Sequence, residues 1–137
     1  MITKKAEYAI LILAELAAHP DDTVLTSREI ATRRSIPANL VIQLMPLLHE
    51  SGWTTGTRGP GGGIKLAINP ASITLREVIE KVDGTIGITR CLFSNQPCGN
   101  KSHCSLRDIW IKAQTNMLSV FEEASIKELA RAMARDN

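Results

Sequence analysis

Aromatic residues and long apolar runs are both scarce in this sequence. Aromatic side chains make up only 4% of the 137 residues, so the core must be mostly aliphatic, and the 44% of hydrophobic residues is enough to build one. No apolar run approaches the roughly 20 residues that a membrane-spanning helix needs. Charged residues interrupt the N-terminal apolar pattern, which therefore lacks the central stretch of a signal peptide. We expect a cytoplasmic domain with no membrane segment.

Catalytic signatures are missing as well. His19, His49 and His103 lie far apart in the sequence, and no candidate nucleophile accompanies them. The glycine-rich run 59–63 lacks the GxxxxGK[ST] pattern and the strand–helix context of a phosphate-binding loop. The net charge of +2 is too small to indicate a nucleic-acid partner by itself. We therefore expect no enzymatic activity, and a binding function has to be inferred from motifs.

The first half of the chain has the pattern of a helix-turn-helix followed by a β-hairpin. Capping residues and apolar periodicity predict helices that begin near Thr3, Thr26, Pro37, Thr74, Ser105 and Ser125. Alternating segments predict strands over 53–58 and 64–68, joined by the glycine-rich turn. A hairpin directly after a helix-turn-helix is a wing, so we predict a mainly α-helical winged-helix fold with a small β wing. Pro46 should kink the second helix of the motif.

The chain divides by function into three segments. We expect a winged helix-turn-helix over residues 1–83, a cysteine loop over 84–105, and a dimerisation helix with a C-terminal helix over 106–137.

DNA binding is the function that a winged helix most often serves, although some winged helices bind proteins instead. A helix fits the major groove, and residues near its start reach the base edges. Asn39 and Gln43 are of the types that pair bidentately with adenine, and Arg58 on the wing would contact phosphate or the minor groove. Glycines beside Arg58 let backbone amides approach the sugar-phosphate. The candidate DNA-binding residues are Arg28, Pro37, Ala38, Asn39, Ile42, Gln43, Arg58, Gly59, Gly61 and Gly62.

All the cysteines of the chain lie in one short stretch. Cys91, Cys98 and Cys104 are separated by six and five residues, most of which favour turns. In a reducing compartment, clustered thiols more often bind metal or act as redox groups than form structural disulfides. The residues alone allow three interpretations of these cysteines: an iron–sulfur cluster, a zinc site completed by His103, or a metal-free thiol switch.

The long helix after the cysteines carries an apolar stripe with a period near 3.6. Its members are Leu106, Ile109, Trp110, Ala113, Met117, Val120 and Phe121. The stripe can pack on the body of the same chain or on a second copy. A pair of recognition helices would match a palindromic site and enlarge the DNA interface.

The wing sequence Arg58-Gly59-Pro60-Gly61-Gly62-Gly63 resembles the signature of the Rrf2 family of bacterial transcription regulators. The resemblance extends over most of the chain, through matching residues at Thr3-Lys4, Tyr8-Ala9, Ile30-Ala31, Ile36, Ile73-Thr74-Leu75 and Trp110. It implies DNA binding, a homodimer formed through the long helix, and three cysteines that hold an iron–sulfur cluster.

The resemblance also bears on the fourth cluster ligand. IscR-like members have a histidine three residues after the third cysteine, where this chain has Arg107, which cannot ligate. NsrR-like members use a carboxylate from the first helix of the partner subunit, and the matching residue here is Glu7. We therefore expect a [4Fe–4S] cluster on Cys91, Cys98 and Cys104 with Glu7 as the fourth ligand, and a [2Fe–2S] cluster is the alternative. For the fourth ligand, Asp108, His103 and solvent stay open as alternatives to Glu7.

From these patterns and the family resemblance, we expect the protein to be a homodimeric repressor that binds an operator in double-stranded DNA. Its cluster would sense nitric oxide, iron or redox state. The alternatives are a zinc-stabilised winged helix that binds a protein, and a DNA-binding regulator with a metal-free thiol switch.

Overall fold

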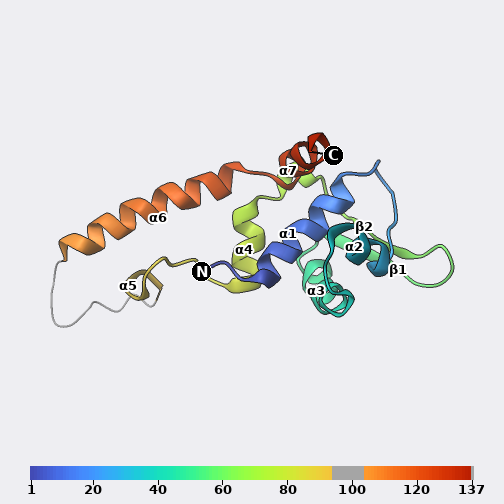
Figure 1. The fold of residues 1–137 in the computed structure, drawn as a ribbon, viewed down its shortest axis with the longest axis horizontal. Helices are drawn as coiled ribbons and strands as arrows, with labels where there is room; N and C mark the ends of the chain where they lie inside the picture. Colours follow the sequence, from blue (N-terminus) through green and yellow to red (C-terminus); the bar gives the residue numbers. More distant parts are fainter. Residues whose placement is uncertain (94–103, 137) are drawn as a thin grey trace.

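Helix α1 (Lys4–Ala17) is the centre of the fold in a computed structural model that describes residues 1–93 and 104–136. The hydroxyl of Thr3 accepts a hydrogen bond from the backbone N–H of Ala6 and so caps the helix. Ala6, Ile12 and Leu13 are fully buried. Four of the later helices pack against α1, so that the core forms around it (Figure 1).

Helices α2 (Ser27–Arg34) and α3 (Ala38–Glu50) form the expected helix-turn-helix. Thr26 caps α2 by accepting from the N–H of Glu29, and Ser35 ends it in the left-handed conformation with φ 53°. Pro37 takes the N-cap position of α3, where a missing N–H costs nothing. Helix α3 continues through Pro46 to Glu50, even though the proline removes one donor from the helix interior.

The wing is a two-stranded antiparallel hairpin of β1 (Thr54–Thr57) and β2 (Gly63–Leu66). Its register pairs Thr54 with Leu66 and Thr57 with Gly63. Leu25, in the link between α1 and α2, forms a further bridge to Ile64, with N–O distances of 2.9 and 2.7 Å. The expected fold class, mainly helical with a small β wing, is confirmed.

Two later helices close the body. A 3-10 turn, η1 (Pro70–Ser72), leads into α4 (Leu75–Asp83), which begins with the expected capping box of Thr74 and Glu77. Helix α7 (Ile126–Arg135) begins after Ser125 and packs against α1 and η1. Ile126 is fully buried, and its N–H donates to the carbonyl of Ile73 at 2.9 Å. The last helix of the chain is therefore part of the winged-helix core.

Helix α6 (Ser105–Glu123) has 19 residues and leaves the body as a long arm (Figure 1). None of its residues is buried. Its C-terminal end is tied to α4 by Arg76, which donates to Glu80 at 2.7 Å and lies 3.5 Å from a carboxylate oxygen of Glu122. A short helix, α5 (Arg90–Phe93), lies beside α6 within the segment that we expected to be a loop.

Candidate nucleic-acid interface and cysteine segment

Helix α3 has one face in the core and one in solvent. Val41, Leu44 and Leu48 are buried and hold the helix against α1 and α2. The opposite face exposes half of the residues that the sequence assigned to DNA: Pro37, Ala38, Asn39, Ile42 and Gln43. Ile42 is 60% exposed, which is unusual for a large apolar side chain at the centre of a helix. An apolar group in this place suits contact with a thymine methyl.

The wing presents a cation at its tip. Arg58 is exposed at the end of β1, and Gly59 and Gly61 follow with φ angles of 90° and 75°. A Cβ atom on Gly62 would lie 2.2 Å from the carbonyl oxygen of Thr57, so the turn closes this tightly only with glycine there. Nδ1 of His49 lies 2.7 Å from the hydroxyl of the buried Thr54, a contact that ties the base of the wing to α3.

A buried ion pair fixes α2 to α1. The carboxylate of Glu15 is 4% exposed, accepts a hydrogen bond from Nε of Arg34 at 2.7 Å, and lies 2.7 Å from Nε2 of His19. Burial alone would raise the pKa of Glu15, but the hydrogen bonds from His19 and Arg34 outweigh it, so the pKa is lowered. Glu15 therefore stays ionised and helps to hold the helix-turn-helix in place. We did not predict this contact from the sequence, although a glutamate inside an apolar stripe, four residues before His19, is a signal for it.

Arg28 completes the set of candidate DNA contacts. It lies in the first turn of α2 and is exposed. Exposed residues of α2, α3 and the wing thus offer two cations, Arg28 and Arg58, and the polar side chains of Asn39 and Gln43. Cations of this kind suit phosphate contacts, and polar groups on a helix suit base edges in the major groove.

Two of the three cysteines lie within the described residues. Cys91 is in α5, Cys104 is the N-cap residue of α6, and both are free thiols that are partly exposed. The Thr89 hydroxyl lies 3.2 Å from Sγ of Cys91, and the N–H of Ile88 donates to the side chain of Gln114 on α6 at 2.9 Å. The hydrogen bond between Ile88 and Gln114 holds the segment that carries Cys91 alongside α6. Cys98 and His103 lie outside the described residues.

Glu7 is on the exposed side of α1, near its N-terminus. Its carboxylate lies 3.1 Å from Nζ of Lys4, and this hydrogen bond raises the pKa of Lys4. Over residues 1–93 and 104–136, no three His, Cys, Asp or Glu side chains come together in a way that could hold a metal ion. Within one copy of the chain, then, the described residues do not bring Glu7 to the cysteines.

The apolar stripe of α6 faces solvent. Leu106, Ile109 and Val120 are 53%, 61% and 63% exposed. Ala113 is also exposed, and Trp110, Met117 and Phe121 are partly covered. No helix in the described parts of the chain is long and apolar enough to cross a membrane.

The helix-turn-helix and the two-stranded wing define a winged-helix protein. Residues 2–132 match the sequence profile of the Rrf2 family, which is described as an iron-dependent transcriptional regulator. The chain belongs to this family, and it is a DNA-binding transcription regulator rather than an enzyme.

Individual relatives agree with this assignment. The transcriptional regulator IscR of Aliivibrio salmonicida is 27% identical over 93% of this chain and 76% of its own length. IscR of Xenorhabdus nematophila is 28% identical over 95% of this chain and 79% of its own length. Among solved structures, CymR (YrzC), the global cysteine regulator of B. subtilis, superposes with a TM-score of 0.84 at 23% identity, over 96% of this chain and 97% of that one. The structure of T. potens IscR superposes with a TM-score of 0.77 at 20% identity, over 96% of this chain and 88% of that one. These two likenesses concern the fold alone.

Proposed function

We propose that this regulator reads an operator with α3 and the wing. The support is the exposure of Asn39, Ile42 and Gln43 on a helix whose other face is locked in the core. Asn39 and Gln43 would contact adenine edges and Ile42 a thymine methyl. Arg28 and Arg58 would contact phosphates, and Gly59, Gly61 and Gly62 would let the wing lie close to the sugar-phosphate. In this proposal residues 1–83 are the DNA-binding part.

The active form that we propose is a homodimer formed through α6. The observation that carries this proposal is a 19-residue helix without one buried residue. Most of the stability of a helix in a protein comes from tertiary packing that covers its apolar face. The seven stripe residues from Leu106 to Phe121 would form that face, and a second copy of the same helix would cover it. Pairing would also set the distance between two recognition helices.

The cysteine segment, residues 84–105, is proposed to hold an iron–sulfur cluster. Cys91 and Cys104 are free and accessible, as ligands must be, and soft thiolates suit such clusters. Cys98 would supply the third thiolate and Glu7 of the partner subunit a weaker oxygen ligand. The similarity to IscR proteins supports this assignment, while Arg107 departs from the IscR-like pattern. When bound, the cluster would supply a centre that reacts with nitric oxide or oxygen, or that is lost when iron is scarce.

Contacts of this chain suggest how the cysteine segment reaches the DNA-binding body. Helix α4 ends at Asp83, whose carboxylate accepts a hydrogen bond at 3.0 Å from the N–H of Thr3, the residue that caps α1. The segment that starts at Gly84 is therefore anchored at the beginning of α1. At its other end the segment continues into α6, which would set the spacing of the dimer. A change in the segment would shift the population of dimers whose recognition helices fit the operator.

Operator binding tests the proposal. An operator is first selected from random duplex DNA with anaerobically purified protein, and its affinity is then measured before and after treatment with nitric oxide. We expect affinity to fall steeply with salt and to change at least about tenfold after treatment, a typical size for an allosteric coupling. Cys91→Ser should lose the response, whereas Arg107→Ala, a nearby change at a position that cannot ligate, should keep it. No salt-dependent binding to DNA, or a response that survives in Cys91→Ser, would contradict the proposal.

A metal-free thiol switch is the second candidate, because Cys91 and Cys104 are free thiols that are partly exposed. It predicts a response to oxidants in protein that contains no iron. The zinc-stabilised protein-binding module predicts one zinc per chain and no operator.

A further inference from the structure

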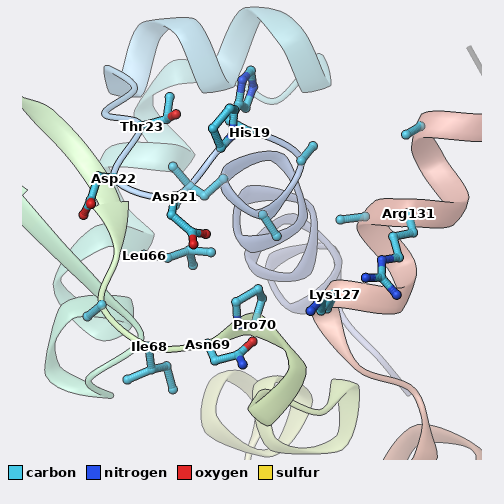
Figure 2. Close-up of a pocket in the computed structure, with 17 residues that line it drawn as sticks. His19, Asp21, Asp22, Thr23, Leu66, Ile68, Asn69, Pro70, Lys127 and Arg131 are labelled. Atoms are coloured by element: carbon cyan, nitrogen blue, oxygen red, sulfur yellow. The ribbon is translucent and has the colours of Figure 1, made fainter.

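A hollow lies where the end of α1, the base of the wing and α7 meet (Figure 2). Its volume of about 550 Å³ falls within the range of small-molecule sites. None of the residues proposed to contact the operator or the cluster lines it. Its apolar lining includes Leu16 of α1, Leu66 at the end of β2 and Pro70 of η1. A ligand here would touch the body of the regulator at a place separate from the cysteine segment.

Opposite charges face this hollow from two sides. Asp21, in the loop after α1, lines one side, and Lys127 and Arg131 line the other (Figure 2). The two cations are four residues apart on α7 and therefore share one face of the helix. Within the described part of the chain, the side chains of Asp21, Lys127 and Arg131 form no hydrogen bond or ion pair with one another or with other residues.

The other titratable groups of the hollow are already engaged. Asp22 lies 3.3 Å from the ammonium of Lys65, and Nε2 of His19 lies 2.7 Å from Glu15. The free groups are thus two cations and one carboxylate, which leaves one positive charge in excess. A complementary ligand carries two carboxylates and one ammonium group, since arginine binds carboxylates in a bidentate geometry and lysine binds them as a point charge.

We propose that this hollow binds an acidic α-amino acid. Its carboxylates would lie toward Lys127 and Arg131, and its ammonium group toward Asp21. The bound amino acid would join α7 to the loop after α1 and to the base of the wing. It would therefore act as a second input to the regulator, apart from the cysteine segment.

Thermal unfolding of the full chain tests this proposal with defined probes. L-glutamate and L-aspartate are titrated at constant ionic strength, and L-glutamine and glutarate serve as matched probes that lack one carboxylate or the ammonium group. A ligand that binds only the folded chain raises Tm in a saturable way. We expect this rise with at least one acidic amino acid, and apparent binding about tenfold weaker or more for glutamine and for glutarate.

Variants then locate the binding. Arg131→Gln and Asp21→Asn each remove an exposed charge from the hollow and should abolish the rise in Tm. Arg135→Gln, at the exposed end of α7 and outside the hollow, is the matched control and should keep it. The proposal is overturned if neither acidic amino acid raises Tm, if glutarate or glutamine binds as well, or if the rise persists in Arg131→Gln and Asp21→Asn.

Discussion

Helices α1 and α6 differ in how much of their surface the chain itself covers. Seven of the 14 residues of α1 are buried, whereas none of the 19 residues of α6 is. Both helices carry apolar stripes, so the sequence pattern alone would give them similar roles. The difference indicates that the body of the same chain covers the apolar stripe of α1, whereas the apolar stripe of α6 requires another surface to cover it.

The largest effect is expected from a substitution in the core of the body, where it should lower the free energy of unfolding. Ile12 is fully buried in α1, and Ile12→Ala should lower the free energy of unfolding by about 2–5 kcal/mol, because it removes buried methyl groups and leaves a cavity. Urea denaturation of the purified protein measures this loss. Ile42→Ala, which truncates an isoleucine that is 60% exposed, is the matched control and should change stability by less than about 0.5 kcal/mol. Equal losses in the two variants would refute the assignment of α1 to the core.

A substitution in the apolar stripe of α6 should weaken dimer formation rather than the folding of the body. Ile109 is 61% exposed in the single chain, and Ile109→Ala should raise the dimer dissociation constant at least about tenfold, because each copy loses apolar contacts in the interface. Sedimentation at several concentrations measures this constant. Lys112→Ala, at an exposed position of α6 that is not in the apolar stripe, provides the comparison and should leave it unchanged. A chain that is monomeric at all concentrations would rule out the dimer.

The buried carboxylate gives the body a pH dependence. Because the pKa of Glu15 is lowered from its ordinary 4.5 in the folded state, its contribution is present above that value and is lost as pH falls through the folded pKa. Glu15→Gln should therefore lower stability by about 1–3 kcal/mol near neutral pH. Urea unfolding of both proteins from neutral to acid pH measures the gap between them, which should narrow on the acid side. A gap that stays constant down to the lowest pH would contradict the ion pair.

A substitution in the wing should have the smallest effect, and it should act on operator binding. Arg58→Ala should weaken operator binding and reduce the slope of log affinity against log salt by about 1, as expected for the loss of one phosphate contact. Fluorescence anisotropy with a labelled operator at several salt concentrations measures both quantities. Arg135→Ala removes an exposed cation at the far end of the chain and should change neither. An unchanged slope in Arg58→Ala would remove this residue from the DNA interface.

Local signals in the sequence were enough to predict the helix-turn-helix and the wing. Thr3, Thr26 and Thr74 cap helices as expected, since a cap depends on residues within one turn. The ion pair of Glu15 with Arg34 was missed because it joins residues 19 positions apart in sequence. The packing of α7 on α1 was also missed, because periodicity identifies an apolar face and does not say which neighbour covers it.

The candidate site was predictable to different extents in its two parts. Exposure of Asn39, Ile42 and Gln43 follows from the apolar period of α3, so the face that we propose to read DNA could be inferred. The place of Cys104 at the start of α6 also follows from the sequence, because a helix was expected to begin near Ser105. The helical turn at Cys91 could not be inferred, because turn-forming residues dominate that stretch. The role of Glu7 depends on a partner subunit, and no pattern within one chain defines it.

Iron and acid-labile sulfide content, with the visible spectrum, of protein purified without air tests the cluster most directly. We expect a brown protein with about four irons and four sulfides per chain, or about two of each for the smaller cluster. Glu7→Ala should keep the fold and lose the cluster faster in air. A colourless protein that contains one zinc, or one that takes up no iron and sulfide on anaerobic reconstitution, would contradict the central claim.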